Sequence, residues 1–179
     1  MNKKKMYHFG AAVARCCPIQ LGHERVFQEM IDLCEHCFVF LGSANAPWSL
    51  PLFFNYHERR ELIRLVFPKL HVVPLPDFPN DNPSWLDAID DILLVAGMNP
   101  AETTFFGGSD EDVLVLSEDG HRRTHIVNRF DGSTPVISAS QVRDALIHKR
   151  ALDGMLNPCI MDEVLRIWTE KWPKFLKKR

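Results

Sequence analysis

Two stretches of the chain combine a basic side chain with a turn into a helix, an arrangement that suits phosphate. Residues 14–23 read Ala-Arg-Cys-Cys-Pro-Ile-Gln-Leu-Gly-His, between an apolar run at 7–13 and an amphipathic run at 24–34. A strand that turns over Pro and Gly into a helix presents unpaired backbone N–H groups, which favour anions. Arg15 and His23 flank this turn and can hold negative charge.

The second stretch, at residues 137–143, reads Ile-Ser-Ala-Ser-Gln-Val-Arg. Ser138 places a hydroxyl at the start of a predicted helix, and Arg143 lies one turn inside it. In an open parallel sheet the loops beyond the carboxyl ends of the strands meet at one cleft, so we expect both stretches and the Gly-Ser-Ala-Asn turn at 42–45 to converge. Two phosphate cradles on one cleft suit a nucleoside triphosphate better than a mononucleotide.

Several other routes to nucleotide or acyl chemistry are excluded by missing motifs. The chain has no Gly-x-x-x-x-Gly-Lys-Ser/Thr loop and no Gly-x-Gly-x-x-Gly fingerprint. It has no nucleophile elbow, and we expect Cys16 and Cys17 to fill the interior near a strand end.

The elements that must position these turns alternate between strands and helices. Apolar runs predict strands at 6–14, 37–41, 70–75 and 103–106, with small extended pieces at 113–116 and 126–130 and a strand-like pair at 136–137. Helical spacing predicts helices over 24–34, from a capping box at Asn55 and Glu58 to Pro68, from Ser84 with Asp87, after Ser138, and near the C-terminus. In the last helix the expected buried stripe is Ile160, Val164, Leu165 and Trp168. The predicted fold is α/β, an open parallel sheet with helices on both faces and a C-terminal helix.

Size and charge narrow the class of protein. We interpret residues 1–179 as a single domain, with a core at about 6–149 and a C-terminal helical segment at about 150–179. A net charge of −2 argues against binding nucleic acid, and no apolar run is long enough to cross a membrane. Five cysteines without a disulfide pattern indicate a reducing cytoplasm. The Cys-Glu-His-Cys run at 34–37 resembles half a metal site, but we expect a helix end running into a strand and no metal there.

The two stretches resemble the signatures of a known superfamily. Residues 14–23 look like Gly-Arg-Phe-x-Pro-x-His-x-Gly-His of the nucleotidylyltransferases, and residues 137–143 are similar to their Ile-Ser-x-Thr-x-x-Arg. Within the superfamily the chain is most similar to the archaeal-type nicotinamide mononucleotide (NMN) adenylyltransferases. The turn at 42–45, the pair Glu58-Arg59, and the Pro-Leu-Pro-Asp run at 74–77 followed by Trp85 carry that likeness.

This resemblance implies a Rossmann-like fold and transfer of AMP from Mg²⁺-bound ATP to NMN, with NAD and pyrophosphate as products and no protein nucleophile. It implies that His23 binds the α-phosphate, that Arg143 and Ser138 hold the β- and γ-phosphates, and that Arg15 lies beside them. Trp85 would stack on the nicotinamide ring, with Asn82 and Asp81 near it. The full set assigned to the site comprises catalytic His23, Gln20, Arg15 and Arg143, ATP-binding Ala14, Gly22, Ser138 and Ser140, and acceptor-binding Trp85, Asn82, Asp81 and Ser43.

The clearest departure from the signature is Gln20, which stands in place of its first His. Losing one transition-state donor costs about a hundred- to a thousandfold in rate, but Gln keeps an N–H donor, so we expect a slow enzyme. Two alternatives stay open: an adenylyl- or cytidylyltransferase for another phosphorylated acceptor such as pantetheine phosphate, and a nucleotide-binding relative without catalysis. The resemblance also favours a homo-oligomer, and it leaves open whether NMN or its deamidated form is preferred.

Overall fold

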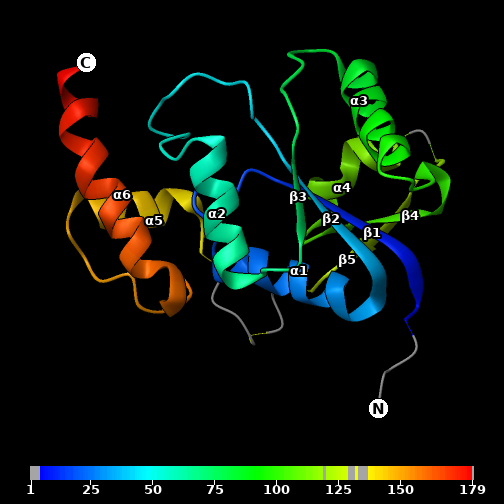
Figure 1. Cartoon of the computed structure of the whole chain (residues 1–179), viewed down its shortest axis with the longest axis horizontal. Coiled ribbons are helices and arrows are strands. Elements are labelled where there is room, and N and C mark those ends of the chain that lie inside the picture. Colours follow the sequence, from blue (N-terminus) through cyan, green and yellow to red (C-terminus); the bar gives the residue numbers. More distant parts are fainter. Residues whose placement is uncertain (1–4, 119, 129–131, 133–136, 179) are drawn as a thin grey trace.

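A computed structural model describes residues 5–118, 120–128, 132 and 137–178, and these form a single five-stranded sheet (Figure 1). All neighbouring strands are parallel, in the order β3-β2-β1-β4-β5. The strands are β1 (Tyr7–Ala14), β2 (Cys34–Leu41), β3 (His71–Pro74), β4 (Thr103–Gly107) and β5 (Arg123–Ile126). The chain places β2 and β3 on one side of β1 and then β4 and β5 on the other, so the strand order reverses between β1 and β4. Doubly wound folds have this strand order, and the predicted fold class is confirmed.

In the described part of the chain, six α-helices connect or follow these strands. They are α1 (Leu21–Leu33), α2 (Tyr56–Val66), α3 (Asn82–Val95), α4 (Asp110–Ser117), α5 (Ala139–Ile147) and α6 (Pro158–Lys177). The predicted capping box of α2 is present, with Asn55 Oδ1 accepting from the Glu58 N–H at 3.0 Å and Glu58 Oε2 accepting from the Asn55 N–H at 2.8 Å.

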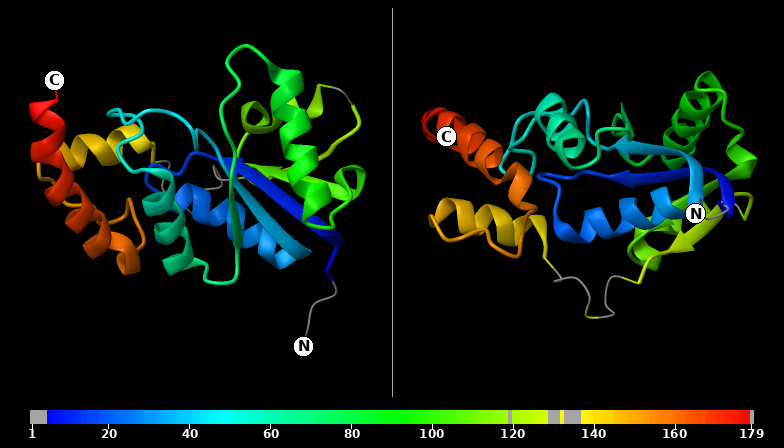
Figure 2. Two further views of the ribbon diagram at one scale, coloured as in Figure 1. Left: turned by 45° about the horizontal axis from the view of Figure 1, so that its top comes forward. Right: turned by 60° about the horizontal axis from the view of Figure 1, so that its bottom comes forward.

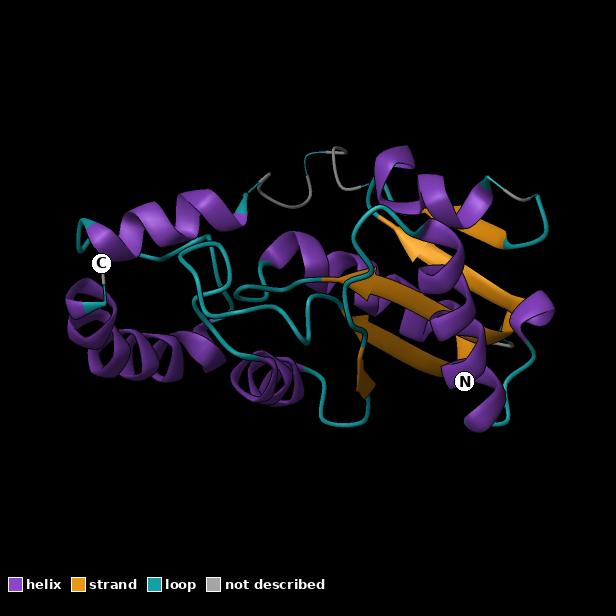
Figure 3. Ribbon diagram, turned by 90° about the horizontal axis from the view of Figure 1, so that it is seen from above, coloured by secondary structure: helices purple, strands orange, loops and turns teal. Residues whose placement is uncertain are grey.

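Helices cover both faces of the sheet because apolar side chains alternate along each strand (Figure 3). On one face Val39 and Leu41 of β2 join the cores of α1 and α2, and on the other Phe38 and Phe40 pack with α3 and the end of α4. The α5–α6 pair lies at one end of the molecule, beside α2 (Figures 1 and 2). Lys171 of α6 ties it there, donating to Glu58 at 2.7 Å and to the Phe53 carbonyl at 2.8 Å.

Several sequence-based boundaries are wrong. Residues 113–116, expected to be extended, lie in α4, because Ser109 and an acidic first turn start a helix that the apolar run continues. The helix α3 is capped by Asp81, not Ser84: Asp81 Oδ1 accepts from the Ser84 N–H at 3.0 Å, and Pro83 fits the first turn. Leu165 is 46% exposed and lies outside the buried stripe of α6.

The first helix and second strand also differ from expectation. The helix α1 begins at Leu21, and residues 34–36 belong to β2 instead of a helix end. The strand extends earlier because residues from Cys34 on pair with β1. The extended piece predicted at 126–130 is misplaced: β5 covers Arg123–Ile126, because its pairing with β4 begins at Arg123, and residues 127–128 lie beyond its end. Residues 129, 130 and 136, also predicted to be extended, lie outside the described residues. Among the described residues, no helix is both long enough and apolar enough to span a membrane.

Candidate nucleotide site

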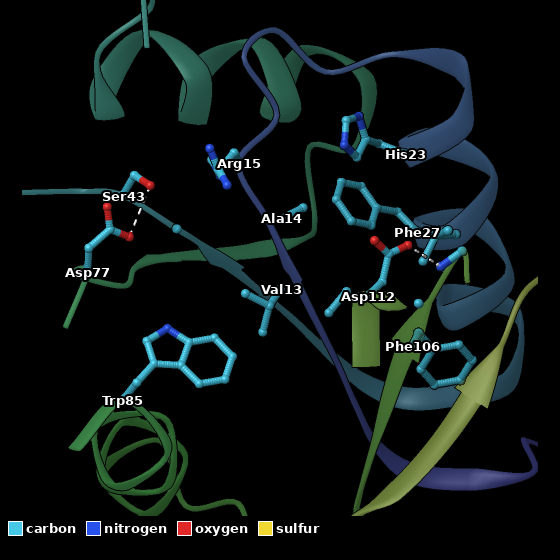
Figure 4. A pocket seen from close by; sticks show the side chains of 15 residues that line it. Val13, Ala14, Arg15, His23, Phe27, Ser43, Asp77, Trp85, Phe106 and Asp112 are labelled. Carbon is cyan, nitrogen blue, oxygen red and sulfur yellow. Dashed lines mark hydrogen bonds between the residues drawn. The ribbon is translucent and has the colours of Figure 1, made fainter. Parts of the chain in front are cut away.

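A cavity of about 360 Å³ opens at the carboxyl ends of four strands, across the point where strand order reverses (Figure 4). It is lined at the strand ends by Ala14 and Arg15 at the end of β1, Gly42 and Ser43 after β2, Asp77 after β3, and Gly107 and Gly108 at the end of β4. Parallel sheets bind their ligands at this place. Two of the three predicted turns, at 14–23 and 42–45, therefore meet here.

Arg15 and His23 supply the basic side chains of this cavity, whose lining also includes two carboxylates. Arg15 is exposed directly after β1, and His23 comes from the first turn of α1 (Figure 4). The Gln20 N–H donates to His23 Nδ1 at 3.3 Å, so in the neutral ring Nε2 carries the proton. Gly22 is buried in the same turn. A ring N–H, a guanidinium and a helix N-terminus together suit a phosphate.

Gln20 is turned away from the cavity. Its side chain is 3% exposed, and with its amide oriented so that both atoms are paired, it donates to the Ile137 carbonyl at 2.6 Å and accepts from the Ala139 N–H at 2.7 Å. The residue that replaces the signature His thus joins the two predicted phosphate turns to each other. This contact brings the start of α5 beside the start of α1.

Arg143 and the two serines of the second turn are held within that junction. Ser138 caps α5, accepting from the Gln141 N–H at 3.2 Å. Arg143 donates to Ser140 Oγ at 3.0 Å and to the Cys17 carbonyl at 3.4 Å, and burial lowers the pKa of its guanidinium. The α5 turn therefore lies next to the cavity, while none of these side chains is part of its lining.

The end of β2 is clasped to the end of β3. Ser43, which has a left-handed backbone at φ 54°, donates through Oγ to Asp77 Oδ1 at 3.0 Å. Asn45 accepts from the Asp77 N–H at 2.7 Å and donates to the Asp77 carbonyl at 3.3 Å. These bonds fix Ser43 and Asp77 on the wall of the cavity.

Arg59 is a buried side chain that stabilises the backbone of the site. Its side chain is 1% exposed and donates to the carbonyls of Arg15 at 2.6 Å, Gly42 at 2.8 Å and Ser43 at 3.3 Å. One guanidinium thus pairs the backbone where β1 and β2 end. The sequence marks Arg59 only as part of a resemblance, because an arginine on a helix gives no sign that it is buried.

A second hollow, of about 470 Å³, adjoins the cavity on the α3 side. The two share Arg15, Ser43, Asp77 and Trp85, and Asn82 lines only the second. Trp85 extends from α3 on the opposite side of the cavity from His23 (Figure 4). Asp81 is outside both linings; hydrogen bonds from Ser84 lower the pKa of this capping carboxylate.

The β4 end contributes residues that the sequence did not single out. Gly107 faces Val113, and a Cβ there would come within 2.7 Å of its Cγ1, so only glycine lets α4 approach this closely. Asp112 accepts from the Gly108 N–H at 3.0 Å and lines the cavity. The Gly-Gly-Ser-Asp run after a predicted strand was the available signal.

Cys16 and Cys17 are buried, as predicted. Burial raises the pKa of both thiols, so neither is suited to act as a nucleophilic thiolate. The phosphate chemistry of the turn therefore falls to its basic side chains and backbone.

No protein-family model matches the chain. The chain is 22% identical over 166 residues to the nicotinamide-nucleotide adenylyltransferase of Pyrococcus furiosus, covering 88% of this chain and 83% of the relative. Related proteins of the same name from Pyrococcus abyssi and Pyrococcus horikoshii are 24% and 23% identical. The resemblance predicted from the two signatures is confirmed.

Among solved structures, a bifunctional NMN adenylyltransferase/ADP ribose pyrophosphatase from Francisella tularensis has the same fold. The TM-score is 0.77 at 14% identity, over 94% of this chain and 50% of that chain. The present chain thus spans about half the length of that protein. A structure of the bifunctional protein with AMP and manganese matches with a TM-score of 0.72 at 15% identity, over 92% of this chain and 49% of that chain.

Proposed function

We propose that the chain is an adenylyltransferase that transfers AMP from ATP to nicotinamide mononucleotide, forming NAD and pyrophosphate. The observation that carries this proposal is the cavity at the strand switch point, which has Arg15 and His23 in its wall and a neighbouring hollow with Trp85. The named activity of the archaeal relatives supports the choice of reaction. Residues 1–179 act as one catalytic domain.

In this reaction a phosphate oxygen of the acceptor attacks the α-phosphorus of ATP in line, and pyrophosphate leaves. The protein supplies position and charge, not a nucleophile. His23 donates through Nε2 to the α-phosphate as negative charge grows, and Arg15 stabilises the same group. Ala14 and Gly22 let the nucleotide approach the turn closely.

The start of α5 takes the β- and γ-phosphates, with Ser138, Ser140 and Arg143 as their ligands. Arg143 now bonds Ser140 and the Cys17 carbonyl, so it reaches the triphosphate only by exchanging these contacts. A divalent cation enters with the triphosphate as part of the substrate. A related structure that holds AMP and a manganese ion supports this assignment, and Mg²⁺ is the ion we propose.

The acceptor occupies the second hollow, where Trp85 stacks on the nicotinamide ring and Asn82 bonds its polar groups. Ser43 orients the acceptor's phosphate or ribose while it holds Asp77. Asp81 acts beside them by fixing the start of α3. We further propose a homo-oligomer, and the five unpaired cysteines support a reducing compartment such as the cytoplasm.

The test incubates the purified chain with ATP, Mg²⁺ and a panel of acceptors: NMN, its deamidated form and pantetheine phosphate. We expect pyrophosphate release with NMN or its deamidated form, and a dinucleotide product by chromatography and mass spectrometry. Pyrophosphate release only with pantetheine phosphate would mean that pantetheine phosphate, and not NMN, is the acceptor. No release with any acceptor, together with ATP binding by calorimetry, would contradict catalysis and favour the non-catalytic relative.

A slow rate is part of the proposal, because Gln20 bonds Ile137 and Ala139 instead of facing the cavity. The Gln20→His variant tests this point. If the signature His serves the reaction here, this variant is faster than the parent; an unchanged rate would mean that Gln20 is purely structural.

A further inference from the structure

We propose that His8, Glu35 and His36 form a transition-metal site at the edge of the sheet opposite the nucleotide cavity. Their ligand atoms all lie within 4.8 Å of one another, and all three residues are exposed. The proposal is independent of adenylyl transfer. It revises the expectation of no metal at 34–37, because that run lacks a complete ligand set of its own and His8 of the neighbouring strand adds a second imidazole to Glu35 and His36.

The sheet itself sets this juxtaposition. The parallel strands β1 and β2 pair Tyr7 with Cys34 and Phe9 with His36, so His8 lies level with Glu35. Strands in a sheet are about 4.8 Å apart, within reach of both side chains. His8 Nδ1 lies 2.5 Å from Glu35 Oε2.

The second imidazole distinguishes this cluster from an ordinary ion pair. The His36 ring lies 5.2 Å from that of His8, centroid to centroid and nearly perpendicular at 81°, and it also packs near Phe9 at 5.8 Å. An exposed His–Glu ion pair involves two side chains only and contributes little to stability, so it does not account for the second imidazole. A metal with bonds of about 2.0–2.2 Å needs its ligand atoms roughly 3–3.5 Å apart, so small rotations of exposed side chains complete the site.

The donor set selects the kind of metal. Imidazole nitrogen suits zinc, nickel, cobalt and copper, whereas Mg²⁺ prefers oxygen ligands in octahedral geometry. Three protein ligands leave one or more positions for water. Glu35 and His36 also line a hollow of about 410 Å³, which gives room for those further ligands. We therefore assign the site to Zn²⁺ or to another of these divalent transition-metal ions.

This site is distinct from the nucleotide cavity. His8 and Ala14 lie six residues apart along β1, which corresponds to about 20 Å. A metal bound here can stabilise the start of β1 against β2 without touching the phosphates. The nearby thiols of Cys34 and Cys37 line the same hollow and are the competing ligands that an experiment must separate.

The direct test titrates the tag-free chain of residues 1–179 with zinc chloride by isothermal calorimetry, without ATP or Mg²⁺. We expect one Zn²⁺ per chain, and binding weakened on the order of tenfold or more in each of His8→Ala, Glu35→Gln and His36→Ala. The matched control is His148→Ala, an exposed His that pairs with Asp144 on α5. It should bind as the parent does, and so should a Cys34→Ser, Cys37→Ser double variant.

A second measurement needs no variant. Nuclear magnetic resonance of the imidazole groups should show the His8 and His36 signals shifting on addition of Zn²⁺ while the His57 signal stays in place. Absence of tight zinc binding in the parent would overturn the proposal. So would binding that survives the loss of His8 and His36, or binding that disappears only with the two cysteines.

Discussion

The carboxyl ends of the strands and their amino ends, called here the carboxyl edge and the amino edge of the sheet, differ in how their polar side chains are held. At the carboxyl edge, Arg59 pairs three backbone carbonyls and Asp77 holds Ser43, so the wall of the cavity is set by buried or partly buried hydrogen bonds. At the amino edge, His8 and Glu35 are about half exposed and are bonded to each other. A cavity that must position a reaction uses fixed groups, whereas a surface site can assemble around the ion it binds.

The largest expected difference between the edges is catalytic. His23→Ala should lower kcat by about a hundred- to a thousandfold, because it removes a donor to the charge that develops on the α-phosphate. His36→Ala makes the same substitution at the amino edge and should leave kcat unchanged. Steady-state kinetics with ATP and the best acceptor measures both; equal losses would place the reaction elsewhere.

Arg59→Met should cost about 2–4 kcal/mol of unfolding free energy, since two buried carbonyls and one partly buried carbonyl lose their donor. Arg64→Met on the same helix removes an exposed arginine that pairs with Glu61 at 3.6 Å and should cost less than about 0.5 kcal/mol. Urea denaturation of both variants measures the difference. An Arg59 variant as stable as its control would mean that the carbonyls find water instead.

Gly10 in β1 and Gly42 directly after β2 differ in the space that surrounds a new Cβ atom. In Gly10→Ala, the new Cβ would meet Cys34 Sγ at 2.5 Å and Met30 Cγ at 2.9 Å, and we expect a loss of about 1–3 kcal/mol. In Gly42→Ala the nearest atom is Arg15 Cγ at 3.8 Å, so stability should change little. Thermal unfolding of the two variants decides; the reverse order would contradict the packing described around β1.

Ser138→Ala is the smallest expected effect on the carboxyl edge. Removing the cap that accepts from the Gln141 N–H should cost about 1 kcal/mol and loosen the start of α5. Ser138→Asn restores a capping side chain and should recover the loss. Amide hydrogen exchange in the first turn of α5 reports the change, and unaltered protection in Ser138→Ala would show that Gln20 alone holds this turn.

The sequence predicted the parts of the fold that follow from local pattern. Apolar periodicity located β1, β3 and β4, and capping residues located the starts of α2 and α5. It failed at residues 113–116, where a short apolar run fits a strand or a helix equally well and the acidic turn before it decides. The prediction also missed the start of β2 at Cys34, because α1 and β2 adjoin there without a turn.

The candidate site was predicted in its outline and missed in its support. Arg15, His23 and Ser43 were found because they follow strand ends. The roles of Arg59, Asp77 and Asp112 could not be read from the sequence, since each depends on contact between segments distant in the chain or on the path of the backbone. Gln20 shows the same limit: its neighbours at 137–139 lie more than a hundred residues away.

The most direct test of the central claim follows the phosphorus atoms of ATP. The chain is incubated with acceptor and with ATP labelled in either the α- or the γ-phosphate. Attack at the α-phosphorus predicts that the α label enters the dinucleotide and the γ label leaves in pyrophosphate, with both transfers nearly lost in His23→Ala. Transfer of the γ label to the acceptor, or its release as inorganic phosphate, would contradict the account.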